Sequence, residues 1–260
     1  MADDQPAGGS EQPLLAHLLE LRQRLLSALT GVFVAFVPLA FFARQLYHLL
    51  AEPLLKLLPP GSAMIATEVA SPFFAPFKLA GLLAFALALP WVLYQLWAFV
   101  APGLYRKERR MVVPLLISST LLFYLGVAFA YFLVLPRIFQ FLLSVTPEGV
   151  SMMTDISKYL DFVLKLFVAF GLAFETPVAI VLLCWTGFVT PQQLRSHRDY
   201  VLVGVFVVAA ILTPPDVVSQ ISMAVCTYLL YEVGILWASW LVRNRTAEKA
   251  AASDSAADGR

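Results

Sequence analysis

The chain has 260 residues, of which 60% are hydrophobic and 13% are charged, and its mean hydropathy is +0.79. A water-soluble domain needs far more charge on its surface, so this composition excludes the soluble globular class and makes the bilayer the solvent for most of the chain. The net charge is only +1. The basic residues are spread through loops and form no basic face for nucleic acid. We therefore expect an integral membrane protein without a nucleic-acid partner.

Uncharged stretches divide the chain into candidate membrane spans, because a spanning helix needs about 20 apolar residues. In chain order, the predicted spans are 25–43, 79–105, 111–136, 159–186, 200–215 and 217–241. The last two are separated by Thr213-Pro214-Pro215-Asp216, whose double proline cannot continue a helix. The sequence thus predicts an all-α membrane protein with six transmembrane helices, of which the fifth and sixth are short.

An even number of spans places both termini on one side of the membrane. Most basic residues outside the spans lie on that side, in segments 22–24, 106–110, 195–198 and 243–249. The positive-inside rule makes this side cytoplasmic. We expect a flexible cytoplasmic N-terminus over 1–13 without a removable signal peptide, a membrane domain over 14–242, and a disordered cytoplasmic tail over 243–260.

The outer loop over residues 45–76 carries leucines at helical spacing, is interrupted by Pro53 and ends at Pro59-Pro60-Gly61. This pattern indicates an interfacial amphipathic helix followed by a turn. We expect the loop to cap the outer face.

Several chemistries are excluded by their missing motifs. No Gly-x-x-x-x-Gly-Lys-Ser/Thr loop is present, no His-Glu-x-x-His motif occurs, and no nucleophile and base form a recognisable pair. Cys184 and Cys226 lie inside predicted spans and are interpreted as buried thiols. We expect no cofactor, no metal and no enzymatic activity.

Two carboxylates lie at the predicted cytoplasmic boundary. Glu20 precedes the first span, and Glu108 stands in the basic loop Arg106-Lys107-Glu108-Arg109-Arg110. A purely structural interpretation pairs Glu20 with Arg24 at i,i+4 and leaves Glu108 as a solvated loop residue. The alternative is that both recognise a charged ligand.

Glu175 lies inside the fourth predicted span, where an ionised carboxylate costs several kcal/mol. The nearby Pro177 is expected to kink the helix. Glu175 can be a protonated structural residue, a functional polar contact, or the proton-binding residue of an ion-coupled secondary transporter, although no duplicated half supports a transporter. Asp161 and Lys165, spaced i,i+4 in the same span, are expected to satisfy each other.

Five separated motifs resemble, in order, those of the TatC component of the twin-arginine protein translocase. The resemblance covers about residues 13–241, and its segments are His17-Leu18-Leu19-Glu20-Leu21-Arg22-Gln23-Arg24-Leu25, Ala70-Ser71-Pro72-Phe73-Phe74, Ala101-Pro102-Gly103-Leu104-Tyr105 with Glu108-Arg109-Arg110, Phe174-Glu175-Thr176-Pro177, and Thr213-Pro214-Pro215-Asp216. It implies a concave, glove-like bundle in the bacterial inner membrane that acts as a receptor for folded proteins with twin-arginine signal peptides.

The resemblance also implies roles for individual residues. Positions matching the signal-peptide site are Glu20, Arg22, Phe99, Pro102, Leu104, Tyr105, Glu108 and Arg109. Glu175, Thr213 and Gln220 match polar contacts to the single-span partners TatB and TatA, while Pro53 and Asp216 match structural members of the outer cap. Other TatC copies and membrane lipid complete the implied partners, and the proton-motive force drives transport.

Overall fold

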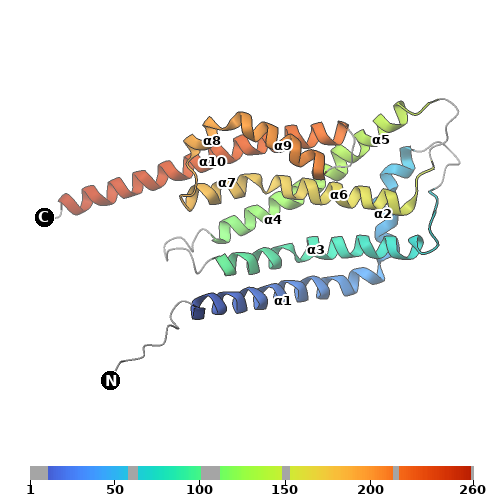
Figure 1. The fold of residues 1–260 in the computed structure, drawn as a ribbon, viewed down its shortest axis with the longest axis horizontal. Coiled ribbons are helices and arrows are strands. Elements are labelled where there is room, and N and C mark those ends of the chain that lie inside the picture. Colours follow the sequence, from blue (N-terminus) through green and yellow to red (C-terminus); the bar gives the residue numbers. More distant parts are fainter. Residues whose placement is uncertain (1–10, 58–63, 101–111, 148–152, 213–216, 259–260) are drawn as a thin grey trace, which may run out of the picture. The chain divides into compact units, whose positions relative to one another are not determined.

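The computed structural model describes residues 11–57, 64–100, 112–147, 153–212 and 217–258. Its elements are helices, and the β structure in the described part is one isolated bridge between Ile65 and Asp155. In order along the chain (Figure 1) they are α1 (Glu11–Phe41), α2 (Ala43–Leu57), α3 (Ser71–Val100), α4 (Val112–Phe129), the π-helical segment η3 (Ala130–Val134), α5 (Leu135–Ser144), α6 (Ile156–Phe174), α7 (Thr176–Trp185), α8 (Pro191–Ser196), α9 (Arg198–Leu212) and α10 (Val217–Asp258).

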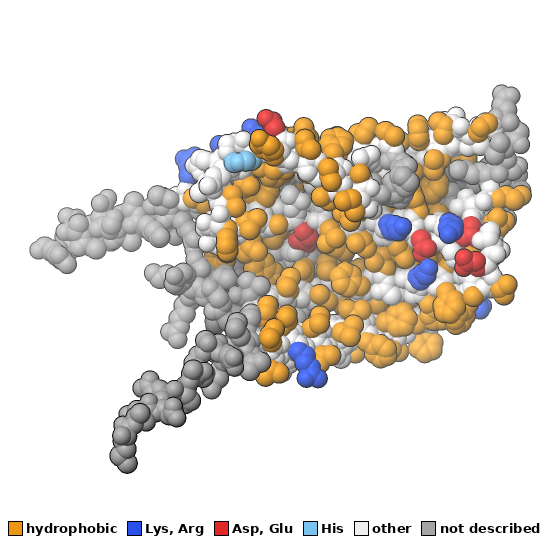
Figure 2. Space-filling view, viewed as in Figure 1, with side chains coloured by type: hydrophobic (Ala, Val, Ile, Leu, Met, Phe, Trp, Pro, Cys, Tyr) orange, Lys and Arg blue, Asp and Glu red, His pale blue; other side chains and the backbone are white. Residues whose placement is uncertain are grey.

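Helical runs long and apolar enough to cross a bilayer confirm the all-α membrane class. The described part holds five of them, over Leu18–Phe41, Ser71–Phe99, Val113–Ser144, Ile156–Trp185 and Val217–Arg243. The remaining predicted span is represented by α9, whose 15 residues extend about 22 Å against a hydrocarbon core of about 30 Å. The count of six crossing helices stays a prediction. Hydrophobic side chains cover most of the described surface on the face drawn in Figure 2.

The chain divides into two compact units. The first comprises Met1–Tyr47 and Pro76–Thr120, and the second comprises His48–Ala75 and Leu121–Arg260. In the first unit, α1 approaches α3 at Gly31, where a Cβ would lie 2.4 Å from Cδ1 of Trp91. Glycine is therefore required at this contact, because any side chain would collide with the indole.

The second unit is built around α6, α7 and α10. Its fully buried side chains include Tyr159, Phe170 and Ile235. Gly234 of α10 lies so close to α7 that a Cβ would be 2.9 Å from Cα of Pro177. Without a side chain at this position the two helices pack backbone against backbone, as is common in membrane bundles.

Helix α2 continues through Pro53, so the predicted interruption at this residue is wrong. Proline has no N–H and leaves the carbonyl four residues earlier, that of Leu49, without its helical partner. The hydroxyl of Tyr131 donates to that carbonyl oxygen at 3.2 Å, and the hydroxyl of Tyr159 donates to the next one, of Leu50, at 2.8 Å. Side chains distant in sequence thus satisfy the backbone around the proline.

Glu175 interrupts the long fourth span, where Pro177 was expected to kink the helix. Helix α6 ends at Phe174 and α7 begins at Thr176, with Glu175 as the capping residue of both. The Glu175 N–H donates to the carbonyl of Leu172 at 3.1 Å, a three-residue spacing that tightens the last turn.

The C-terminal segment is helical where composition predicts a disordered tail. Helix α10 extends to Asp258. Residues 246–258 contain alanine at many positions and neither proline nor glycine. Alanine has the highest helix propensity, so the segment can extend the preceding helix without help from tertiary packing.

Asp155 caps the N-terminus of α6 and anchors the segment after α2. Its Oδ1 accepts from the N–H groups of Ser157 and Lys158 at 2.9 and 3.0 Å. Its Oδ2 accepts from the N–H and the hydroxyl of Thr67 at 2.9 and 2.7 Å. These bonds, the Lys158 N–H foremost, lower the pKa of Asp155 to about 2.

The Asp155 cap predicts a specific loss of stability in acid. The folded-state pKa lies below the ordinary value of 3.8, so the cap stabilises the fold fully above about pH 4 and loses this contribution as pH falls toward 2. The apparent melting temperature should fall more steeply between pH 4 and pH 2 for the wild type than for Asp155→Asn, because the amide does not titrate in this range and its single oxygen cannot accept from both Thr67 and the helix N-terminus. Parallel slopes would contradict the assignment.

A second prediction concerns the carbonyl of Leu49. Tyr131→Phe should destabilise the protein by about 1 kcal/mol, because it leaves this carbonyl unpaired. In a Pro53→Ala background the restored N–H of Ala can bond the same carbonyl, and the cost of Tyr131→Phe should shrink. Unfolding in mixed micelles measures all four proteins, and an equal cost in both backgrounds would show that Tyr131 acts elsewhere.

Candidate functional site

The described members of the predicted site fall into both compact units. Glu20, Arg22 and Phe99 belong to the first, and Pro53, Glu175 and Gln220 to the second. The other predicted residues lie outside the described part of the chain: Pro102, Leu104, Tyr105, Glu108, Arg109, Thr213 and Asp216.

Glu20 lies on α1 and is bound to a guanidinium of its own chain. Its Oε1 is 3.5 Å from Nη2 of Arg24, and the two side chains retain 34% and 35% of their surface. The i,i+4 pair expected from the structural interpretation is therefore formed. The carboxylate nevertheless remains open to solvent, so the pair does not exclude a ligand.

Arg24 has a second partner, Gln95, which was not among the predicted site residues. Nη1 of Arg24 donates to Oε1 of Gln95 at 3.2 Å, and Nε2 of Gln95 donates to Oγ of Ser27 at 3.0 Å. Gln95 is buried, with 5% of its surface exposed. Its only signal in the sequence is that it is a lone amide within the apolar span 79–105; buried polar groups in spans need partners and are often functional.

The other two described residues of the first unit have different surroundings. Arg22 is exposed on α1, two residues from Glu20. Phe99 is half-buried, one residue before the end of α3. Residues two apart on a helix do not share a face, so Arg22 and Glu20 point in different directions.

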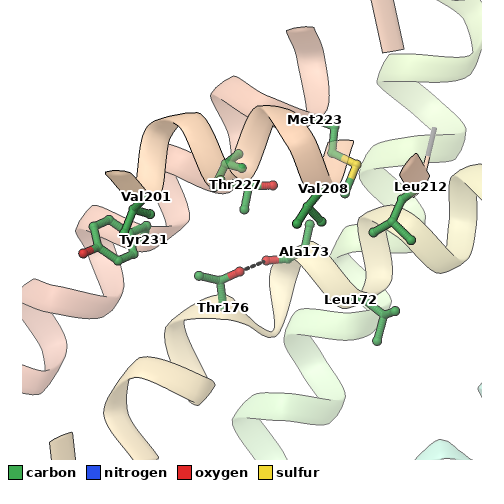
Figure 3. A pocket seen from close by; sticks show the side chains of 11 residues that line it. Leu172, Ala173, Thr176, Val201, Val208, Leu212, Met223, Thr227 and Tyr231 are labelled. Atoms are coloured by element: carbon green, nitrogen blue, oxygen red, sulfur yellow. Dashed lines mark hydrogen bonds between the residues drawn. The ribbon is translucent and has the colours of Figure 1, made fainter. Parts of the chain in front are cut away.

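Glu175 is half-buried at the junction of α6 and α7, and its Oε1 is enclosed. A cavity of about 380 Å³ lies beside this junction. Figure 3 shows side chains of α6, α7, α9 and α10 around it, and the lining residues are Leu172, Ala173, Thr176, Val201, Gly204, Val205, Val208, Leu212, Met223, Thr227 and Tyr231. Gln220 is half-buried near the start of α10 and does not line this cavity.

Two threonines in the cavity lining differ in their hydrogen bonding. The hydroxyl of Thr176 donates to the carbonyl of Ala173 at 2.7 Å, drawn as the dashed line in Figure 3. The hydroxyl of Thr227 is buried and has no hydrogen-bond partner among the described residues. A buried hydroxyl without a partner costs free energy.

Lys165 does not form the expected pair with Asp161. Its side chain is exposed on α6 and makes no ion pair or hydrogen bond within the described part of the chain. The i,i+4 spacing brings two side chains near each other, but it does not fix their rotamers. The described part of the chain offers no explanation for an ammonium within this span.

The described residues contain no group of three side chains able to hold a metal ion. Cys184 is buried and Cys226 is half-buried, and both are free thiols. The described part of the site brings together a carboxylate, a guanidinium and an amide on two helices, an arrangement that can bind a charged ligand.

Comparison with known proteins identifies the family. The model of the family described as Sec-independent protein translocase protein (TatC) matches residues 16–226. The chain belongs to the TatC family. It is 56% identical over 237 residues to the TatC protein of Escherichia coli K12, covering 90% of this chain and 92% of that protein. It is 55% identical over 249 residues to the TatC protein of Azotobacter chroococcum, covering 96% of each.

A solved TatC structure has the same fold. The crystal structure titled twin-arginine translocase receptor TatC superposes with a TM-score of 0.75 at 40% identity, covering 86% of this chain and 98% of that one. The resemblance drawn from the motifs is thus confirmed. This TatC chain is a multi-pass membrane protein and a component of the Sec-independent translocase, and it is not an enzyme. The transporter hypothesis for Glu175 is replaced by this assignment.

The two cavity threonines give a matched pair of variants. Thr176→Val removes a formed hydrogen bond and should lower the free energy of unfolding by about 1 kcal/mol. Thr227→Val removes a hydroxyl without a partner and should leave stability unchanged or raise it by up to about 1 kcal/mol. Unfolding in mixed micelles measures both, and a loss at Thr227 equal to that at Thr176 would mean that a bound molecule satisfies its hydroxyl.

Proposed function

We propose that this TatC chain is the core receptor subunit of the twin-arginine translocase and binds the twin-arginine signal peptides of folded proteins. The observation that carries the proposal is the ion pair of Glu20: its carboxylate is about one-third exposed and already binds the guanidinium of Arg24. The same chemistry suits an arginine supplied by a ligand. Arginine forms bidentate, planar bonds to a carboxylate that lysine cannot copy, so a carboxylate site can favour arginine over lysine.

The rest of the binding patch is proposed from the family motifs. Arg22 and Phe99 would flank Glu20 and contact the ligand segments beside the two arginines. Glu108 would supply the second carboxylate, so that each arginine has its own partner. The remaining proposed members are Pro102, Leu104, Tyr105 and Arg109.

The proposal also places this chain in a larger assembly. Glu175, Thr213 and Gln220 would form polar contacts with transmembrane helices of TatB and TatA, and Pro53 and Asp216 would stabilise the outer cap. Glu175 supports this role because a half-buried carboxylate within a span gains from a polar partner. Further TatC copies and membrane lipid surround the chain in the bacterial inner membrane, with both termini cytoplasmic.

Transport would follow binding. The complex of this chain with TatB holds the signal peptide, the proton-motive force drives recruitment of TatA, and the folded cargo crosses. The chain breaks no covalent bond in this sequence of events. Its contribution is recognition and assembly.

A peptide-binding measurement tests the receptor role. The full chain in lipid nanodiscs is titrated with a labelled peptide that carries two adjacent arginines before an apolar segment, and with its dilysine counterpart. Glu20→Gln should weaken binding of the arginine peptide by about ten- to a hundredfold and reduce its advantage over the lysine peptide. Glu68→Gln, which removes an exposed carboxylate of the other unit, is the control. Equal affinity of both peptides for the wild type would remove the recognition role.

A further inference from the structure

Arg24 is held between two acceptors through two different nitrogens. Nη2 faces Glu20 at 3.5 Å, and Nη1 donates to the Gln95 amide oxygen at 3.2 Å. Each bond can therefore break while the other persists. Arg24 can therefore release Glu20 and keep Gln95 as its acceptor.

The two bonds of Arg24 differ in strength and in rigidity. At 3.5 Å the contact with Glu20 is longer than the 2.7–2.9 Å typical of charge-assisted hydrogen bonds. Both partners are about one-third exposed, and exposed ion pairs contribute little. The Glu20 contact is thus the one that an incoming cation can replace.

The amide oxygen of Gln95 is oriented toward Arg24 before any ligand binds. A guanidinium only donates, so the amide oxygen must face Arg24, and the amide nitrogen then donates to Oγ of Ser27 at 3.0 Å. Ser27 is itself tied to α3, because Nε1 of Trp91 donates to its carbonyl at 3.0 Å. Burial of Gln95 leaves it little freedom to rotate away from this position.

We propose that Gln95 is a positioning residue for ligand exchange at Glu20. When an arginine of the ligand takes the Glu20 carboxylate, Gln95 retains Arg24 and prevents it from becoming an unpaired charge at the membrane boundary. Arg24 is, in turn, an internal competitor that occupies Glu20 when no ligand is bound. This inference rests on the proposed role of Glu20 in binding arginine, and it assigns Gln95, Arg24 and Ser27 to the exchange.

The proposal makes predictions of opposite sign for two neighbouring residues. Arg24→Met removes the competitor and should tighten binding of the diarginine peptide by about two- to fivefold. Gln95→Leu removes the acceptor that receives Arg24 and should weaken binding by about three- to tenfold. Ser27→Ala, which frees the Gln95 amide to rotate, should weaken binding in the same direction by a smaller factor.

The double variant separates exchange from a general structural effect. Without Arg24 there is nothing for Gln95 to retain, so Gln95→Leu should have no effect on affinity in the Arg24→Met background. If the weakening persists in that background, or if Arg24→Met weakens binding, the proposal is overturned. Melting temperatures and intrinsic tryptophan fluorescence of each protein, to which Trp91 contributes, establish that the substitutions have not disrupted the packing.

The outcomes distinguish this inference from the receptor function on which it rests. Failure of the receptor function appears in the wild type and in Glu20→Gln, as equal affinity for the two peptides or no loss on substitution. Failure of the exchange appears when Glu20→Gln weakens arginine binding as expected while Gln95→Leu leaves the affinity unchanged. Nanodisc titrations of the full chain with the same two peptides supply every value.

Discussion

Within a bilayer, every backbone N–H and C=O group needs a partner inside the protein, and this requirement governs the irregular parts of the fold. At Pro53 the freed carbonyl of Leu49 receives the hydroxyl of Tyr131. At the α6–α7 junction Pro177 leaves the carbonyl of Ala173 without its helical N–H, and the hydroxyl of Thr176 donates to that carbonyl at 2.7 Å. In both places a proline disturbs a helix, and a side-chain hydroxyl bonds the carbonyl that the proline leaves unpaired.

The same requirement applies more severely to charge. Arg24 lies at the start of an apolar span, where its guanidinium has to find acceptors from its own chain when no ligand is present. Glu20 gives it a charged acceptor and Gln95 a neutral one, both within reach of one rotamer. The neutral acceptor matters because it satisfies the guanidinium without adding a second negative charge to the site.

Composition and spacing were sufficient to predict the membrane class, the long spans and the shortness of α9, because hydropathy over about 20 residues is a local property of the sequence. Two features depended on residues distant in sequence and could not be predicted from local patterns. Helix α2 survives Pro53 because Tyr131, from another helix, bonds to it. Gln95 joins the site because α1 approaches α3 closely at Gly31. The position of Lys165 is a local matter that spacing also left open, because an i,i+4 spacing from Asp161 does not select a rotamer.

For the proposed recognition role of Glu20, the internal arginine bound to its carboxylate also bears on selectivity. Any cationic ligand has to displace Arg24 from Glu20, so the cost of displacement is the same for arginine and lysine. Arginine can offset it with two parallel bonds to the carboxylate, whereas lysine offers a single compact charge that is more strongly hydrated. Competition by Arg24 therefore lowers the affinity for both ligands, and lysine, which binds the carboxylate more weakly, is the one that fails to displace it. In the proposed exchange this arrangement also favours release of the ligand, because Arg24 remains beside Glu20, held by Gln95, and can reoccupy the carboxylate as the ligand leaves.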